Sequence, residues 1–204
     1  MKEKGILARF LEKCIRILLI KECKKISNLK IDIISSSNQI IRGEIQKITI
    51  IAEYINYKDL LFDTFDLEAK HLKINFQLTN RELYFKESSL VKFKIALSQS
   101  SLRTILLSNS WNWIGNMISK ELSNQEKLED IKIRDDQLLI KSSKNNIFNQ
   151  GEKINIKLEK GKVYLENKIY NKIIQIPIED KIYIEKIYIE NNLLNIFANS
   201  SISF

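Results

Sequence analysis

The stretch that decides the fold is IRGEIQKITIIAEYINYKDLLFDTFDLEAKHLKINFQL, at residues 41–78. Apolar and polar residues alternate through it, which is typical of β-strands with one buried face. The alternation slips by one residue after Ile45 and again after Ala69, where the apolar positions change from odd to even numbers. Because a slip would turn the rest of each strand inside out, we predict β-bulges at residues 46–47 and 70–71. A short loop at each place is the competing explanation.

A third slip lies near the C-terminus. Ile182 and Ile184 give way to Ile187 and Ile189, which predicts a further bulge at residues 185–186. Repeated bulges in long strands bend a sheet, so we expect the sheet to be strongly curved.

Three β-hairpins are predicted by apolar alternation on both sides of a two-residue turn. The turns are Asp135-Asp136, Lys160-Gly161 and Asn191-Asn192. The predicted cross-strand pairs are Ile133 with Leu138, Ile131 with Ile140, Leu158 with Val163, Ile156 with Leu165, Ile189 with Leu194, and Ile187 with Ile196. Each register places apolar pairs on one face, so we expect an antiparallel sheet with one dry and one wet face.

An amphipathic helix is expected at residues 6–26. Its polar side is a narrow stripe at helical spacing, made of Arg9, Glu12, Lys13 and Arg16. The apolar sector is much wider and comprises Ile6, Leu7, Phe10, Leu11, Cys14, Ile15, Ile17, Leu18 and Leu19. Such a helix is expected to bury most of its surface, either in a curved sheet or partly in a membrane interface, and the two can coexist.

A helical insertion is expected at about residues 99–122. Residues 98–101 offer several N-caps, and Ser110 is expected to cap a second helical part. Trp111 and Trp113 lie two positions apart and therefore point about 200° apart on a helix. Either each indole packs on a different element, or one lies at a membrane interface, where indoles are favoured.

These patterns predict an α+β fold that is mainly β. A strongly curved antiparallel sheet would wrap a long N-terminal amphipathic helix, with the helical insertion near 99–122. The length of 204 residues fits a single domain. We expect residues 1–26 to form a basic amphipathic helix packed on or flanking the domain, and residues 27–204 to form one curved-sheet domain.

The residue types that catalysis and metal binding need are scarce. His71 is the one histidine, and the two cysteines, Cys14 and Cys23, lie nine positions apart on the expected helix, too far to pair within it. The motifs GxGxxG, GxxxxGK[ST], GxSxG and HExxH do not occur. We therefore expect no enzyme activity, no cofactor and no metal site.

The positive charge is concentrated near the N-terminus. The chain has a net charge of +8, and residues 1–30 hold nine basic and three acidic residues, which leaves the rest nearly neutral. A basic arm fits an anionic membrane surface, whereas a nucleic-acid binder usually spreads a basic stripe over its folded face. We expect no nucleic-acid partner, although the net charge keeps that class as a third hypothesis.

No membrane-crossing or secretory segment is expected. The longest apolar run in residues 1–30 is residues 17–20, whereas a spanning helix needs about 20 apolar residues and a secretory signal an uninterrupted core of about 7–15. We expect a peripheral position on the cytoplasmic side of a membrane, and a periplasmic location is less favoured.

Three blocks of the sequence resemble a known family. The blocks are SNLKIDIISSSNQIIRGEIQKITIIAEYINYKDLLFDTFDLEAKHLKINF (27–76), with the apolar-apolar-x-Gly element at Ile40, Ile41 and Gly43, FKIALSQSSLRTILLS (93–108), with its Leu-x-x-x-Leu at Leu102 and Leu106, and IPIEDKIYIEKIYIENNLL (176–194). They are similar to the LmeA-like phospholipid-binding proteins, formerly a domain of unknown function, and the chain resembles the cyanobacterial type of member over residues 6–204. The resemblance implies a lipid-binding, β-rich domain similar to tubular lipid-binding (TULIP) proteins, and it carries over no catalytic residue.

Two groups of residues are candidates for function. The candidates for an apolar lipid cavity are Phe10, Ile15, Leu18, Ile50, Leu67, Ile74, Phe76, Phe93, Ile95, Leu102 and Leu106. The candidates for a membrane-facing surface are Lys13, Arg16, Lys24, Lys25, Trp111 and Trp113. The expected function is non-enzymatic binding or carriage of phospholipid in an elongated apolar cavity, with phospholipid and an anionic membrane surface as partners. The alternative is a structural or adaptor module that docks on a membrane and has no cavity.

Overall fold

The computed structural model describes residues 5–77, 82–85, 89–142 and 151–202. The helices of this described part are α1 (Ile6–Glu22), α2 (Ser37–Ile41), α3 (Gln99–Leu107) and α4 (Asn112–Ser123). Its strands are β1 (Lys25–Ile34), β2 (Glu44–Tyr57), β3 (Leu60–Gln77), β4 (Glu82–Phe85), β5 (Ser89–Ser98), β6 (Leu128–Arg134), β7 (Gln137–Ser142), β8 (Glu152–Glu159), β9 (Lys162–Asn167), β10 (Lys172–Gln175), β11 (Ile182–Glu190) and β12 (Leu193–Ile202). The fold is α+β and mainly β, as predicted.

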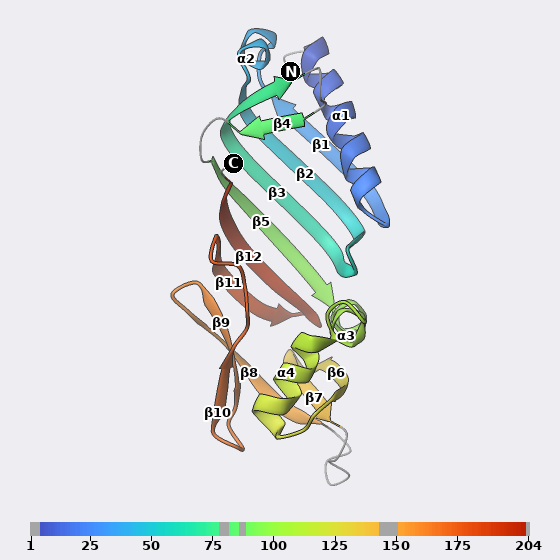
Figure 1. Ribbon diagram of the computed structural model, residues 1–204, viewed down its shortest axis with the longest axis vertical. Coiled ribbons are helices and arrows are strands. Elements are labelled where there is room, and N and C mark those ends of the chain that lie inside the picture. Colours follow the sequence, from blue (N-terminus) through green and yellow to red (C-terminus); the bar gives the residue numbers. More distant parts are fainter. Residues whose placement is uncertain (1–4, 78–81, 86–88, 143–150, 203–204) are drawn as a thin grey trace.

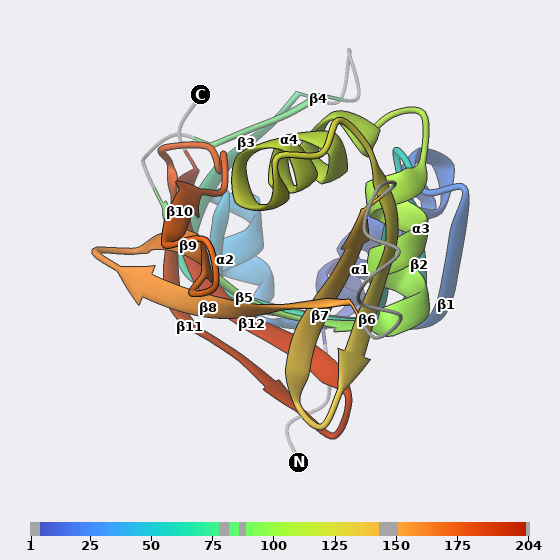
Figure 2. The ribbon, with the colours of Figure 1, turned by 90° about the horizontal axis from the view of Figure 1, so that it is seen from below.

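The strands form two antiparallel sheets. The larger has the order β1-β2-β3-β5-β12-β11, with β4 paired to β3, and the smaller has the order β10-β9-β8-β7-β6. The larger sheet and α1 make up one end of an elongated molecule, and α4 and the smaller sheet make up the other (Figure 1). Seen from below, β8 lies beside β11, and contacts of β8 and β9 with β11 bring the two sheets together (Figure 2).

The three predicted hairpins and all six of their cross-strand pairs are confirmed. Both residues of each turn, Asp135-Asp136, Lys160-Gly161 and Asn191-Asn192, have φ between 49° and 76°. Two consecutive positive φ angles define the turn whose twist matches the flanking strands. Asp, Asn and Gly tolerate this left-handed backbone, which explains why the turns fall at these residues.

A fourth hairpin, between β2 and β3, was not predicted. Its turn is Lys58-Asp59, with φ of 49° and 66°. The pairing runs from Tyr57 with Leu60 to Glu44 with Lys73 without a register shift. Asp59 is the residue in the sequence that could have indicated this turn, because Asp tolerates a left-handed backbone. Its backbone N–H bonds to the Asn56 side chain at 3.1 Å and closes the turn.

The three slips in alternation have two different structural causes. The bulge at residues 185–186 is confirmed, because the register of β11 against β12 shifts between Ile184 and Lys186. At residues 46–47 and 70–71 the buried side does change, but β2 and β3 keep one register there. Each strand has one extra residue at this point, between the pairs Ile45–Leu72 and Lys47–Lys70, so the register is unchanged. In β3 the extra residue is His71, whose φ is 52°.

The predicted helices differ from the observed ones at their ends. The N-terminal helix stops at Glu22 and not at residue 26, because the backbone is extended at Cys23 and β1 begins at Lys25. The insertion near 99–122 is two helices, and Ser98 caps α3 by accepting the Ser101 N–H, as predicted. The cap predicted at Ser110 is wrong, since α4 begins after Trp111 and the Trp111 N–H bonds to Ser108 Oγ instead.

The larger sheet does not bury most of the surface of α1, so burial within the sheet alone is not what the structure shows. Ala8 and Leu11 are buried with apolar residues of β1, β2 and β3, and Glu12 Oε1 accepts the N–H of Ile33 at 2.9 Å. The opposite side of α1 remains exposed, with Ile6 84% and Ile17 66% accessible. The larger sheet contacts the helix along one side, and α2 also contacts it.

A second core lies around α3, α4 and the smaller sheet. It contains Leu106, Leu122, Leu128 and Ile140, and Leu97 and Leu194 extend it into the larger sheet. Beneath α4, Glu152 is 5% exposed and Asn167 is fully buried. Glu152 Oε2 accepts bonds from Ser123 Oγ at 2.6 Å and Asn167 Nδ2 at 2.8 Å, which ties α4 to β8 and β9.

Candidate functional site

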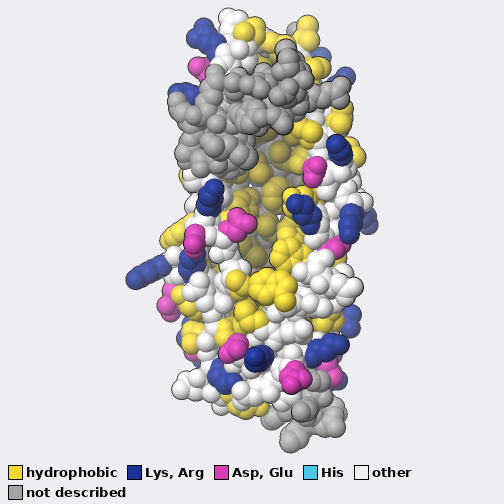
Figure 3. All heavy atoms as spheres, in the orientation of Figure 1, with side chains coloured by type: hydrophobic (Ala, Val, Ile, Leu, Met, Phe, Trp, Pro, Cys, Tyr) yellow, Lys and Arg dark blue, Asp and Glu magenta, His cyan; other side chains and the backbone are white. Residues whose placement is uncertain are grey.

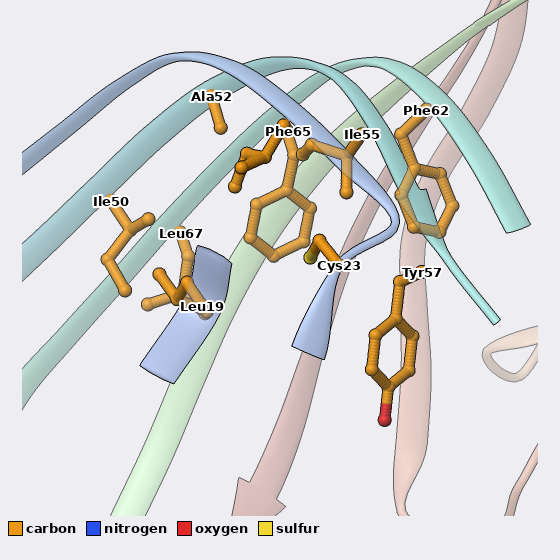
Figure 4. Close-up of a pocket in the computed structure, with 10 residues that line it drawn as sticks. Leu19, Cys23, Ile50, Ala52, Ile55, Tyr57, Phe62, Phe65 and Leu67 are labelled. Carbon is orange, nitrogen blue, oxygen red and sulfur yellow. The ribbon is translucent and has the colours of Figure 1, made fainter. Parts of the chain in front are cut away.

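The candidate site is an apolar pocket between the C-terminal end of α1 and the larger sheet. Its volume is about 220 Å³ and its lining surface is apolar throughout. The ten lining residues are Leu19, Cys23, Ile26, Ile50, Ala52, Ile55, Tyr57, Phe62, Phe65 and Leu67. In the close-up, β2 and β3 pass over the pocket and α1 lies beneath it, while the Tyr57 hydroxyl points away from the other lining side chains (Figure 4).

The lining arises from the alternation of β2 and β3. Ile50 pairs with Leu67 and Ala52 pairs with Phe65 across the two strands, so four side chains share one face. The extra residues between Ala52 and Ile55 and between Phe62 and Phe65 keep the next apolar side chains on the same side. Ala52 has the smallest side chain among them and leaves space where a larger residue would fill it.

Only part of the predicted cavity set meets in this pocket. Ile50 and Leu67 line it, as predicted. Ile15 and Ile74 belong to the core that surrounds it. Ile95, Leu102 and Leu106 pack instead in the core around α3 and α4, and Phe93 packs against Val163, Ile184 and Ala198. The side chain of Phe76 lies outside the described residues, although its backbone pairs with Leu83.

Two cavity predictions are wrong. Phe10 is 56% exposed and Leu18 is 49% exposed, and neither lines the pocket. Phe10 follows the buried Ala8 by two positions, which rotates it about 200° round the helix axis. The wide apolar sector predicted for α1 therefore divides into a face on the sheet and a face toward solvent.

Most of the pocket residues were missed at the level of sequence. Ala52 and Phe65 were available as positions in the alternating runs, because they share a face with Ile50 and Leu67. Cys23 and Ile26 carried no such signal, since they follow the end of α1 and were expected to continue the helix. The pKa of the Cys23 thiol is raised, mainly by burial and secondly by the negative charge of Glu22. The raised pKa favours the neutral thiol in the pocket wall.

An open hollow and a second cavity also border the larger sheet. Figure 3 shows a hollow midway along the face seen in Figure 1, with hydrophobic side chains gathered on its floor. A cavity of about 320 Å³ lies between β7, β8 and β11 and has a mixed lining that includes Asp136, Gln137, Lys153 and Asn155. The apolar lining distinguishes the pocket at α1 from this second cavity.

A charged junction lies at the β2–β3 turn, two residues from Tyr57 of the pocket lining. Asp59, in the β2–β3 turn, accepts bonds from Lys24 Nζ at 2.6 Å and from Ser110 Oγ at 2.8 Å. The hydrogen bonds from Lys24 and then Ser110 lower the pKa of the Asp59 carboxyl. The junction joins three segments: the link between α1 and β1, the β2–β3 turn and the loop between α3 and α4.

The predicted membrane-surface residues fall into two sets. Lys13 and Arg16 are exposed on α1, whereas Lys24 is engaged with Asp59 and Lys25 lies 5.9 Å from the Tyr54 ring. Trp111 is half-buried and donates its indole N–H to the Lys58 carbonyl at 3.0 Å. Trp113 is 49% exposed on α4, so the two indoles do differ in their environments.

Within the described ranges, no group of three or more His, Cys, Asp and Glu side chains is arranged to hold a metal ion. A search of the same ranges for a helix of sufficient length and hydrophobicity to cross a membrane finds none. Comparisons with models of known families, with curated proteins and with solved structures find no match. The family resemblance therefore stays a prediction, and the pocket is the feature on which a functional proposal can rest.

Proposed function

We propose that the protein is a non-enzymatic binder or carrier of phospholipid, and that the pocket at α1 holds part of an acyl chain. The observation that carries the proposal is the pocket itself, with its volume of about 220 Å³ and its apolar lining. An apolar cavity of about 150 Å³ in a protein interior stays dry and binds benzene. The larger pocket has room for a stretch of hydrocarbon chain.

The energetics favour exchange of a chain with a bilayer. Moving a methylene group out of water yields about 0.8 kcal/mol, and the bilayer offers the same gain, so a matching pocket accepts a chain at little net cost. The pocket is partly open to solvent, so a guest chain would remove its apolar lining from water.

The finer architecture belongs to the same proposal. A strongly curved larger sheet that wraps α1 would continue the pocket into an elongated cavity. Support comes from the irregular levels of β2 and β3, from the bulge in β11 and from the hollow over the larger sheet (Figure 3). The resemblance to LmeA-like proteins implies the same arrangement, with the protein peripheral to a membrane.

Native mass spectrometry of the purified protein tests the proposal, and we expect mass increments of bound phospholipid. Replacement of Ala52 by Leu would fill the pocket, because Ala52 is 1% exposed and lines it. We expect this variant to carry less lipid and to melt at a higher temperature, since part of the void is removed.

Ala96→Leu is the matched control. Ala96 is 3% exposed and does not line the pocket. Overpacking there should destabilise the protein by about 1–3 kcal/mol while the folded fraction keeps its lipid. Protein that is free of lipid and takes up none from added phospholipid would contradict the proposal, as would equal lipid content in the Ala52 and Ala96 variants. If the protein is instead an adaptor without a cavity, it should be free of lipid and take up none from added phospholipid.

A further inference from the structure

The outer face of α1 carries an exposed apolar stripe. Its large side chains are Ile6, Phe10, Ile17 and Ile20, with exposed fractions of 84%, 56%, 66% and 52%. Steps of three and four positions, through Lys13, place them on one side of the helix. Ala8 and Leu11, on the opposite side, are buried against the sheet. The stripe is therefore surplus to the fold of the described residues.

The charges beside the stripe are positive. Arg9, Lys13, Arg16 and Lys21 are all exposed on α1. Of the two acidic residues of the helix, Glu12 faces the sheet, where it accepts the Ile33 N–H, and Glu22 lies in the last turn at about 160° from Ile6 round the helix axis. The outer face thus combines large apolar side chains with cations and carries no carboxylate in its centre.

We propose that this face of α1 lies in the plane of an anionic lipid bilayer and docks the protein there. An interfacial helix sinks its apolar side chains to the depth of the acyl boundary, and flanking Lys and Arg side chains reach the phosphates. The 17 residues of α1 span about 25 Å, which suits a helix lying along a surface. The docking rests on the outer face of α1 and does not require the pocket on the opposite side of the helix to hold a lipid.

Two other occupants fit the face less well. A second copy docked through the same stripe would place four cations against four cations, because a two-fold contact brings identical surfaces together. A nucleic acid would satisfy the cations but would leave Phe10 and Ile17 in contact with phosphates or water. The anionic bilayer alone matches both the charge and the apolar side chains.

Vesicle co-sedimentation of the full chain tests the docking. We expect binding to vesicles of phosphatidylcholine with added phosphatidylglycerol, and much weaker binding to phosphatidylcholine alone. The double variant Phe10→Ser, Ile17→Ser should bind roughly 100-fold more weakly, because each large apolar side chain contributes about tenfold. Lys13→Gln with Arg16→Gln should weaken binding to anionic vesicles roughly 25-fold, at about fivefold per charge, and flatten its salt dependence.

The matched control removes apolar side chains elsewhere. Ile169 and Ile173 are 64% and 53% exposed near β10, at the other end of the molecule. Their replacement by Ser should leave vesicle binding within twofold of the unmodified protein. All three variants should keep the same melting temperature, since only exposed side chains change.

A second measurement keeps the apolar face intact. In a background with both cysteines replaced by Ser, an environment-sensitive fluorophore on Ile17→Cys should shift to the blue with anionic vesicles, and one on Ile173→Cys should not. The proposal is overturned if the unmodified protein does not bind anionic vesicles, or if the variant Phe10→Ser, Ile17→Ser binds them as tightly as the control variant. Equal fluorescence shifts of the labels at positions 17 and 173 would also overturn it. Loss of a dimer in that variant would overturn it in favour of a second copy.

Discussion

Glu68 shows how single charges act on the outer faces of the larger sheet. Its carboxylate lies 2.5 Å from Lys47 Nζ and 3.0 Å from Lys70 Nζ, in β2 and β3. Hydrogen bonds from Lys47 and then Lys70 lower the pKa of Glu68 to about 2. Lys47 and Lys70 lie at the two levels where bulges were predicted, and the Glu68 carboxylate pairs with both of them.

We therefore expect an acid dependence that can be assigned to Glu68. A carboxyl whose pKa is lowered on folding stabilises the protein above the pKa of the unfolded chain, near 4.3, and the contribution is lost as the pH falls toward about 2. The difference in melting temperature between the unmodified protein and Glu68→Gln should be constant above about pH 5 and shrink below it. A carboxyl carbon titration of Glu68 by NMR with a midpoint near 4 would contradict this.

Gly43 is a position where only the absence of a side chain allows the fold. Its φ is +78°, and a Cβ there would lie 2.0 Å from the Ile74 carbonyl oxygen, while the Ile74 N–H bonds to the Gly43 carbonyl at 2.7 Å. Gly43→Ala should lower the free energy of unfolding by at least about 2 kcal/mol, measured by denaturant titration.

Gly5→Ala is the control, since a Cβ at Gly5 meets only the Ser37 hydroxyl, at 2.9 Å, and that side chain can rotate. We expect a change within about 0.5 kcal/mol there. Equal effects at the two glycines would show that backbone strain is not the cause.

At the scale of elements, α1 is a wall of the core and not a free arm. Leu11 is 6% exposed against the sheet, and the adjacent Phe10 is 56% exposed. Leu11→Ala should destabilise the protein by about 2–4 kcal/mol, and Phe10→Ala should change stability by about 0.5 kcal/mol or less. Thermal or urea unfolding of the pair measures the difference.

Deletion of residues 1–26 extends the same comparison to the whole element. It would uncover Ile33, Ile48 and Leu72 of the first core, so we expect aggregation or loss of folding. A folded, monomeric body after this deletion would contradict the role of α1 as a core wall and would favour the adaptor alternative.

The elements also show what the sequence could predict. Two-residue turns and alternation depend on local contacts, so the hairpins at Asp135, Lys160 and Asn191 were predicted with the correct pairs. The pocket depends on which strand face α1 covers, and that is decided by contacts between residues far apart in the chain. Ile50 and Leu67 were therefore found, whereas Cys23 and Phe62 were not.

The N-terminal helix also shows what spacing in the sequence cannot predict. Phe10 and Leu18 fit an apolar sector by spacing, but spacing alone cannot say that the sheet contacts only one side of α1. The sequence likewise could not show that the irregular residues of β2 and β3 lie opposite each other, because that depends on how the two strands pair. Each slip was visible in its own strand, and only their pairing shows that the register is unchanged.

At the scale of the whole molecule, the pocket belongs to one of two cores. The core around α1, β1, β2 and β3 surrounds it, and the core around α3, α4 and the smaller sheet lies toward the other end. A guest chain should therefore stabilise the molecule locally and leave the smaller sheet nearly unaffected.

Hydrogen–deuterium exchange with and without a short-chain phospholipid measures this. We expect slower exchange in the last turns of α1 and in residues 50–67, and no change in β6, β7 and β10. Protection spread evenly over both sheets, or confined to the smaller one, would contradict the location of the pocket.

Because one helix supplies both the pocket wall and the outward stripe of Ile6, Phe10, Ile17 and Ile20, any two processes that displace it are thermodynamically coupled. Reciprocity then requires that, if a bilayer shifts α1 and so changes the affinity of the pocket for a hydrocarbon chain, an occupied pocket changes the affinity of the protein for the bilayer by the same factor. Binding and release of a hydrocarbon chain in the pocket would then change how tightly the protein binds the bilayer, with α1 as the element that connects the two.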